Sequence, residues 1–264
     1  MGNVRFISLA SGSSGNCYCL VHQGQALLID AGIGVRTIRR RLEQAAVEWN
    51  SLCGLLLTHD HYDHIRGIGA WLNRDAIPVF GLHAVLKAVA GSRFGRKVHP
   101  DTWHHVSKGV PFPLDAFSVT PFDLPHDSID HAGYFIVAGH VKWLLATDVG
   151  YVTPTLQSFL RLASHAVLEA NYDPEMLLRG NYPKELKDRI RGRGGHLSNA
   201  ETAALIEDAY HHALQALCLC HLSAENNSPL LAHQALHGAL LRLGADARVD
   251  LHVLPRDTAY ELQL

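Results

Sequence analysis

The chain has 264 residues, 47% of them hydrophobic and 18% charged, with a formal net charge of −2. This composition excludes low-complexity disorder, collagen and coiled coil, and the near-neutral charge argues against a protein coated with positive charge. No apolar run reaches the roughly 18 residues that a membrane span needs. The five cysteines have no paired CxxC spacing, and the N-terminus has no long apolar segment. We therefore expect a reduced, cytoplasmic protein without a membrane partner.

The first half of the chain is predicted to be rich in strands. A Ser/Gly cluster over residues 11–16 predicts a turn, and helical patterns are expected over Val35–Val47 and Ile65–Asn73. The segments rich in β-formers are Val4–Ala10, Tyr18–His22, Ala26–Ile29, Leu52–Thr58, Pro78–Leu82, Phe117–Phe122, Gly133–Val137 and Val141–Thr147.

Helices are predicted to dominate the second half of the chain. The clearest start is Ser198, which with Glu201 fits a capping box ahead of a helix through Ala203–Ala213. Ser228 followed by proline predicts a second helix start, with the helix running to Leu243. The remaining predicted elements are helices Thr155–Ala163 and Pro183–Arg191 and strands Leu214–Leu219, Leu251–Leu254 and Tyr260–Leu264. Strands interleaved with helices, without a linker or repeat, favour one α/β domain whose sheets are covered by helices.

The strongest chemical signal is a cluster of histidines over residues 58–64, in a chain with nineteen histidines. Alternate residues of an extended chain share one side, so His59 and His61 can point at one place. If the chain then turns into a helix, Asp63 and His64 face a second place. The alternative is a solvated, His-rich loop, but so many ligand-type side chains in six residues favour a binding site.

The pattern His59-x-His61-x-Asp63-His64 resembles the signature of metallo-β-lactamase-fold hydrolases. The resemblance extends along nearly the whole chain in the family's order, with four further matching positions: Asp30, His126, Asp148 and His221. Three further segments resemble the YycJ/WalJ group of that family, namely residues 11–16, 195–199 and 221–227.

The resemblance implies an α/β fold of the four-layer αββα type, with two mixed β-sheets flanked by helices. It implies a single domain over residues 1–264, without the β-CASP insert of RNase J-type nucleases. Its metal ligands would be His59, His61 and His126 for one ion, Asp63, His64 and His221 for a second, and Asp148 between the two. Imidazole and carboxylate ligands suit two Zn²⁺ or Mn²⁺ ions, with Fe a further choice, and the sequence does not select among them.

The same resemblance implies three further roles. Asp63 would orient or deprotonate the attacking water, and Asp30 would accept hydrogen bonds from a ligand imidazole or backbone amides. His196, just before the predicted helix cap, would hold phosphate and protonate the leaving oxygen. Glu169 and Asn171 fall where tRNase Z-like enzymes carry a His–Glu relay, but this sequence lacks that histidine, so we assign them no role.

Candidate substrate contacts lie next to His196. Residues 179–193 contain six basic and two acidic side chains, as a polyanionic substrate would favour, although the same residues suit a solvated helix with internal ion pairs. The candidate contacts are Ser13, Arg189, Arg191, Arg193, Ser198, Asn199 and Asn227.

The predicted function is a two-metal hydrolase of phosphodiesters in nucleic acid, using a hydroxide shared by the ions. Resemblance to the YycJ/WalJ group implies a 5′→3′ exonuclease on duplex DNA, and no obligate protein partner is evident. One alternative is an ester, thioester or lactone hydrolase on the same fold, which would need a closed, partly apolar pocket. A second is a module that binds metal or nucleotide without catalysis.

Overall fold

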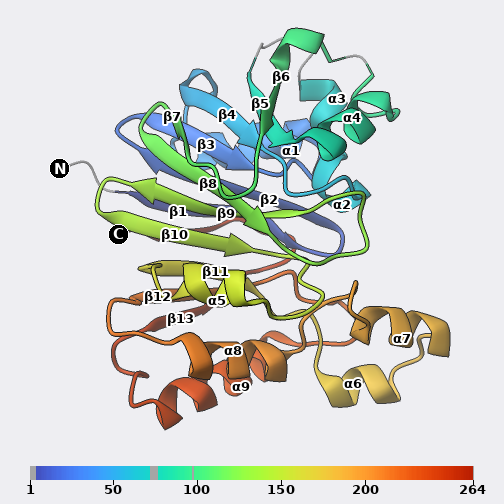
Figure 1. The fold of residues 1–264 in the computed structure, drawn as a ribbon, viewed down its shortest axis with the longest axis vertical. Helices are drawn as coiled ribbons and strands as arrows, with labels where there is room; N and C mark the ends of the chain where they lie inside the picture. Colours follow the sequence, from blue (N-terminus) through green and yellow to red (C-terminus); the bar gives the residue numbers. More distant parts are fainter. Residues whose placement is uncertain (1–3, 72–76, 97, 264) are drawn as a thin grey trace.

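A computed structural model describes residues 4–71, 77–96 and 98–263, and in it two seven-stranded mixed sheets pack face to face with helices on their outer surfaces (Figure 1). This arrangement confirms the four-layer αββα fold predicted from the sequence. None of the helices in these three ranges is long and apolar enough to cross a membrane.

The first sheet is built mainly from the N-terminal half of the chain. Its strands are β1 (Arg5–Gly12), β2 (Gly15–His22), β3 (Gln25–Ile29), β4 (Leu52–Leu56), β5 (Val79–Leu82), β6 (Trp103–Val106) and β14 (Tyr260–Gln263), in the order β14-β1-β2-β3-β4-β5-β6. The pairs from β14 to β3 are antiparallel and those from β3 to β6 parallel. The helices of this half are α1 (Val35–Gln44), α2 (Tyr62–Ile65), α3 (Ile68–Trp71) and α4 (His83–Gly91), with 3₁₀ turns at Trp49–Ser51 and Pro100–Thr102.

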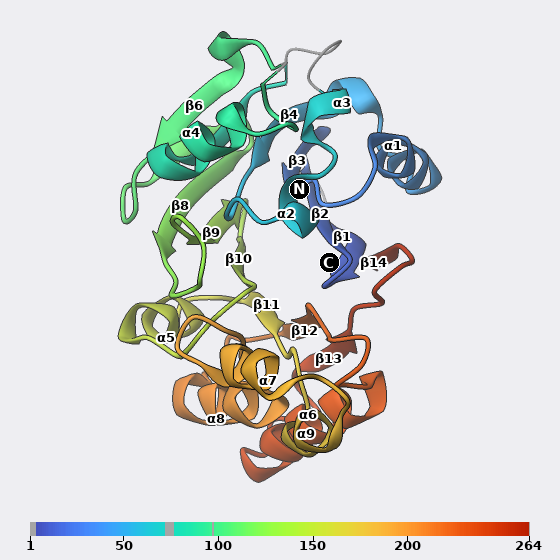
Figure 2. The same ribbon diagram turned by 90° about the vertical axis from the view of Figure 1, so that its right-hand side faces the viewer.

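The second sheet repeats this plan. Its strands are β7 (Phe112–Leu114), β8 (Phe117–Asp123), β9 (Ala132–Ala138), β10 (Val141–Ala146), β11 (His165–Glu169), β12 (Ala216–Cys220) and β13 (Asp250–Val253). The pairs from β7 to β10 are antiparallel and those from β10 to β13 parallel. Its helices are α5 (Pro154–Leu160), α6 (Pro174–Arg179), α7 (Lys184–Arg191), α8 (Asn199–Ala209) and α9 (Pro229–Arg242). The helices α5, α8 and α9 cover its outer face, as Figure 2 shows.

Two apolar layers hold these elements together. The first lies between the sheets, where the rings of Phe6 and Trp143 stack with centroids 4.7 Å apart. The second lies beneath the outer helices of the second sheet and includes Leu205 and Leu236. Strands with both faces buried need no polar alternation, which explains the continuous apolar run of β12.

Both predicted helix starts are confirmed. Ser198 accepts the backbone N–H of Glu201, and the Glu201 side chain accepts the backbone N–H of Ser198, which completes the capping box of α8. Ser228 caps α9, with proline at its first position.

Several predicted boundaries are wrong. The helix predicted over Ile65–Asn73 is two short helices, α2 and α3, and residues 72–73 lie outside the described residues. The chain bends between them at Gly67, whose N–H donates to the Ala31 carbonyl and where a Cβ would lie 2.3 Å from the carbonyl oxygen of Ile33. The helix predicted to reach Ala213 ends at Ala209, because the next residue is extended with ψ 143°.

The sequence prediction also missed five elements, α4, α6, β6, β7 and β11. Of these, β11 matters most, because all five of its residues are buried between β10 and β12 and its last residue is Glu169. Only its three central residues, Ala166–Leu168, are apolar, and so short a run has no period that distinguishes a central strand from a buried helix segment.

Trp143 lies in the apolar layer between the sheets and is 1% exposed. We therefore expect its truncation to destabilise the fold strongly. We expect Trp143→Ala to lower the free energy of unfolding by about 3–5 kcal/mol, because it removes the Phe6 contact and leaves a cavity. Urea denaturation measures this, with the half-exposed Leu162→Ala as a control expected to stay within about 0.5 kcal/mol. Equal costs for the two variants would contradict the assigned packing.

Candidate metal centre

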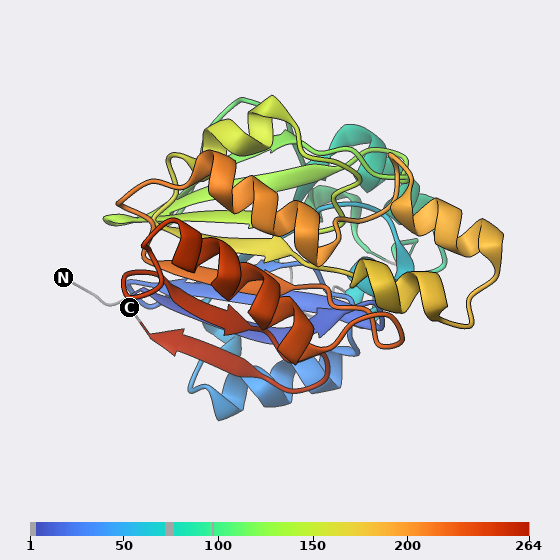
Figure 3. The same ribbon diagram turned by 90° about the horizontal axis from the view of Figure 1, so that it is seen from below.

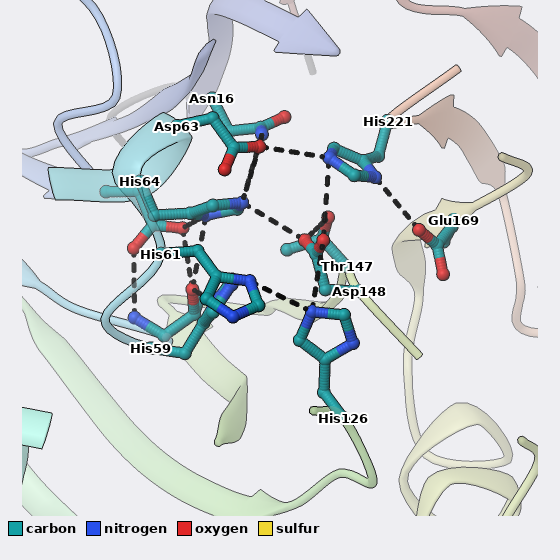
Figure 4. A network of polar contacts seen from close by, with 12 residues as sticks. Asn16, His59, His61, Asp63, His64, His126, Thr147, Asp148, Glu169 and His221 are labelled. Atoms are coloured by element: carbon teal, nitrogen blue, oxygen red, sulfur yellow. Dashed lines mark hydrogen bonds and ion pairs between the residues drawn. The ribbon is translucent and has the colours of Figure 1, made fainter. Parts of the chain in front are cut away.

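Histidine and aspartate side chains from both sheets converge where the strands end (Figure 4). The first sheet contributes Asp30 after β3 and the segment His59–His64 after β4. The second contributes His126 after β8, Asp148 after β10 and His221 after β12. All of these residues follow the carboxyl ends of their strands, so the two sheets present their ligand-bearing loops to each other.

Three of these residues have a left-handed backbone. The φ angles are 59° at Asp30, 56° at Asp148 and 55° at His221. Residues with a Cβ adopt this region at a cost of about 1–3 kcal/mol, and such strain concentrates at functional sites. The conformation turns the chain sharply at each strand end.

The first group of donors consists of His59, His61 and His126. Their ring nitrogens lie within 4.8 Å of one another, and Nε2 of His126 is 3.3 Å from Nδ1 of His61. The second group consists of Asp63, His64 and His221, with Oδ2 of Asp63 3.4 Å from Nε2 of His64 and 3.3 Å from Nε2 of His221.

Asp148 lies between the two groups. Its Oδ2 is 3.1 Å from Nε2 of His64, whereas its Oδ1 is 3.5 Å from Nε2 of His221 and 3.8 Å from Nε2 of His126. One carboxylate therefore faces donors of both groups.

The donor atoms fit divalent cations. Two ligand atoms at about 2.0–2.1 Å from a tetrahedral ion lie roughly 3.3 Å apart, close to the separations within each group. His59 adds a second observation, because its Nε2 is buried and has no hydrogen-bond partner. A cation held with the two neighbouring imidazoles would satisfy this buried, unpaired nitrogen.

The opposite nitrogens of the rings are fixed by neighbouring groups. His64 Nδ1 lies 2.7 Å from the fully buried Asp30, which also accepts from the amide and hydroxyl of Thr58. His126 Nδ1 lies 3.0 Å from the carbonyl of Gly195, and His221 Nδ1 lies 2.9 Å from Glu169. With a cation bound, each Nδ1 would donate to its oxygen and each Nε2 would present its lone pair to the ion. Asp30 thus lies beside a ring nitrogen of His64, and the orienting role that the family resemblance implies for it stays a prediction.

The charges in the centre are strongly coupled. Burial lowers the pKa of His64 and His221, but nearby carboxylates outweigh burial and raise both, that of His221 to about 10. Burial raises the pKa of Asp63, but His64 and His221 outweigh it and hold this carboxylate ionised. Bound cations would take the place of the protons on these imidazoles.

Glu169 connects the donors to His196. Its Oε1 lies 2.8 Å from Nδ1 of His196 and 2.9 Å from Nδ1 of His221, and its Oε2 accepts the amides of Val149 and Leu197. Burial raises the pKa of Glu169, but His196 and further hydrogen bonds outweigh this and lower it to about 2. Burial lowers the pKa of His196, and the charge of Glu169 raises it above its ordinary value. The sequence assigned Glu169 no role, and the structure gives it the orientation of two imidazoles.

The predicted substrate contacts separate into two sets. Ser13, Arg189 and His196 line one cavity of about 210 Å³. Arg191 lies 3.6 Å from Asp188, and Arg193 stacks over the ring of Tyr151, so these two do not line it.

Three other candidates are interior groups. Ser198 serves as the α8 cap, and the side-chain amides of Asn199 and Asn227 bond to each other at 2.9 Å. All three are less than 5% exposed, so the structure does not bring them to the cavity.

Sequence reasoning missed two other polar groups. Asn16 places its side-chain nitrogen 3.3 Å from Asp63 Oδ2 and 3.1 Å from His64 Nε2. Asn171 donates to the carbonyl of His221 and lies 3.2 Å from its Nδ1. Asn16 closes the Ser/Gly segment already singled out, so that motif carried the signal.

A family model described as a beta-lactamase superfamily domain matches residues 25–222. The chain is 30% identical over 249 residues to exodeoxyribonuclease WalJ of Streptococcus pneumoniae, covering 94% of this chain and 93% of that protein. It is also 30% identical over 241 residues to exodeoxyribonuclease YycJ of Bacillus anthracis, covering 91% and 90%. Among solved structures, the metallo-beta-lactamase fold protein YhfI from Bacillus subtilis aligns with a TM-score of 0.69 at 16% identity, covering 98% of this chain and all of that one.

The family match spans most of the chain, and the two curated relatives align along nearly their full length. Both the predicted family and the predicted class of enzyme are thereby confirmed. The chain belongs to the beta-lactamase superfamily, as a metallo-β-lactamase-fold hydrolase similar to YycJ and WalJ.

Proposed function

We propose that this hydrolase is a two-metal phosphodiesterase that removes nucleotides from DNA. The observation that carries the proposal is the His196–Glu169 pair beside the two donor groups, with His196 Nδ1 3.7 Å from Asp148 Oδ1. Cleaving a phosphodiester creates an alkoxide that must be protonated, and a buried carboxylate that raises the pKa of an imidazole keeps it protonated to a higher pH than a free imidazole.

The proposed metal ligands are His59, His61 and His126 for one ion and Asp63, His64 and His221 for the other, with Asp148 between them. When bound, two divalent ions, Zn²⁺ or Mn²⁺, would activate water and neutralise the charge that develops on the phosphoryl group.

The side chains of this protein would position the attacking water and protonate the departing oxygen. In the second group of metal ligands, Asp63 has the most exposed side chain, at 21%. Because its pKa is held low, we assign it the orientation of the attacking water rather than the removal of a proton. His196 gives a proton to the departing oxygen, and Glu169 fixes its ring.

DNA is favoured because both curated relatives described above are named exodeoxyribonucleases. Their names support attack on strand ends, and the 5′→3′ direction stays the expectation from the resemblance to the YycJ/WalJ group. Of the basic residues of α7, Arg189 lines the cavity. Two of these basic residues are paired, since Arg189 bonds Asp127 at 2.5 Å and Lys184 lies 3.4 Å from Asp188. Exposed pairs of this kind contribute little stability and can exchange partners with phosphates.

Removing the metals should destabilise the fold. We expect the wild-type chain to hold two divalent ions and to melt at a higher temperature with them, because ions that bind only the folded chain stabilise it. Asp148→Asn should lower the ion content and abolish this increase, whereas His237→Ala, a substitution on α9, should change neither. Elemental analysis and thermal melts provide the measurements, and a wild type that retains only trace cation would refute the centre.

Cleavage should depend on the same residues. His61→Ala should abolish hydrolysis, because one ligand is lost, while His196→Ala should reduce kcat by about 10²- to 10⁴-fold with the ion content unchanged. The assay compares labelled DNA, RNA, a thioester and a lactone under each ion. Faster turnover of the thioester or lactone than of DNA would replace the nuclease with an ester-type hydrolase.

The pH profile should report the Glu169–His196 pair. A general acid works only while protonated, so kcat falls as pH rises through the pKa of His196. Glu169→Gln removes the charge that raises this pKa and should move the basic limb of the profile to lower pH. Stopped-flow rates across pH 5–10 would test this, and an unmoved limb in a correctly folded variant would exclude the pair as the acid.

A further inference from the structure

The cavity beside His196 has one apolar wall. That wall is formed by Tyr182, which precedes α7, and by Leu186 and Ile190 of α7 itself. The other lining residues are mainly polar and include His196, Asn171 and Ser223. With about 210 Å³, the cavity is smaller than the 300–1,000 Å³ typical of sites for drug-sized ligands. It has room for one flat ring system.

The apolar wall is not explained by the folding of the core. No residue of α7 is buried, and its aliphatic side chains Leu186 and Ile190 are only half-buried and face the cavity. Figure 3 shows that α6 and α7 lie at one end of the molecule, away from the outer helices α8 and α9. A wall of this kind gains free energy when an apolar surface covers it.

A backbone hydrogen bond fixes the wall relative to the reacting groups, and an exposed ion pair lies beside it. The backbone N–H of His196 donates to the carbonyl of Ile190 at 2.9 Å. Arg189 bonds Oδ2 of Asp127, whose Oδ1 lies 3.5 Å from Nε2 of His126. The helix therefore stands at a set position beside the proton donor and the first donor group.

We propose that this cavity receives the nucleobase of the departing nucleotide, stacked on Tyr182 and flanked by Leu186 and Ile190. The inference rests on the proposed nuclease function. Stacking on an aromatic ring is tolerant of sequence, because every base has a flat π-face. The cavity has room for one base, which matches the release of one nucleotide at a time from a strand end.

The test compares two duplexes that differ at one position. In one, the first nucleotide released carries a normal base, and in the other it carries an abasic tetrahydrofuran analogue. The wild type should show a KM for the abasic duplex that is about 5- to 150-fold higher, with kcat changed less. Tyr182→Ala should raise KM for the normal duplex by a similar factor and should no longer distinguish the two duplexes.

Control variants separate stacking from other effects. Tyr182→Phe keeps the ring and should restore most of the discrimination, and Leu241→Ala, at an exposed position of α9, should behave as wild type. If Tyr182→Ala still distinguishes the two duplexes as strongly as wild type, the base does not stack here and the inference is wrong. A wild type that hydrolyses neither duplex with any ion would instead overturn the nuclease function itself.

Discussion

Four carboxylates, those of Asp30, Asp63, Asp148 and Glu169, lie between imidazoles where the two sheets meet. Burial of so many acidic groups is unfavourable unless positive charge or hydrogen-bond donors accompany each of them. The histidines and backbone amides supply these partners. The strained turns at Asp30, Asp148 and His221 serve this arrangement, because they direct the side chains toward one another rather than along the sheets.

Glu169 shows how one carboxylate can serve two tasks. Its Oε1 accepts from His221, which would hold a cation, and from His196, which would donate a proton. The two backbone amides bound to Oε2 prevent the carboxylate from rotating away from either ring. The same side chain would therefore orient both the proposed metal ligand and the proposed proton donor.

The sequence predicted the local part of this centre from its own spacing. His59 to His64 lie in a short segment, so the alternation of an extended chain was enough to place them in two groups. His126, Asp148 and His221 are distant in sequence, and only the resemblance to a known family connected them. The fold class was predicted for the same reason, although the short apolar strand β11 was missed.

The failures have physical causes. Glu169 lacked the neighbouring histidine on which a relay was expected to depend, whereas its partners are His196 and His221, far along the chain. Asn199 and Asn227 are polar residues in promising motifs, but each is the other's hydrogen-bond partner inside the fold. Polarity in a sequence does not distinguish an interior amide pair from a pair that faces substrate.

Each group of donors draws on both sheets. In the first group, His59 and His61 follow a strand of the first sheet and His126 follows a strand of the second. In the second group, Asp63 and His64 come from the first sheet and His221 from the second. Neither sheet alone supplies a complete group. A cation in either position would act as a cross-link between the two sheets, so the loaded protein should lose both sheets in one cooperative transition.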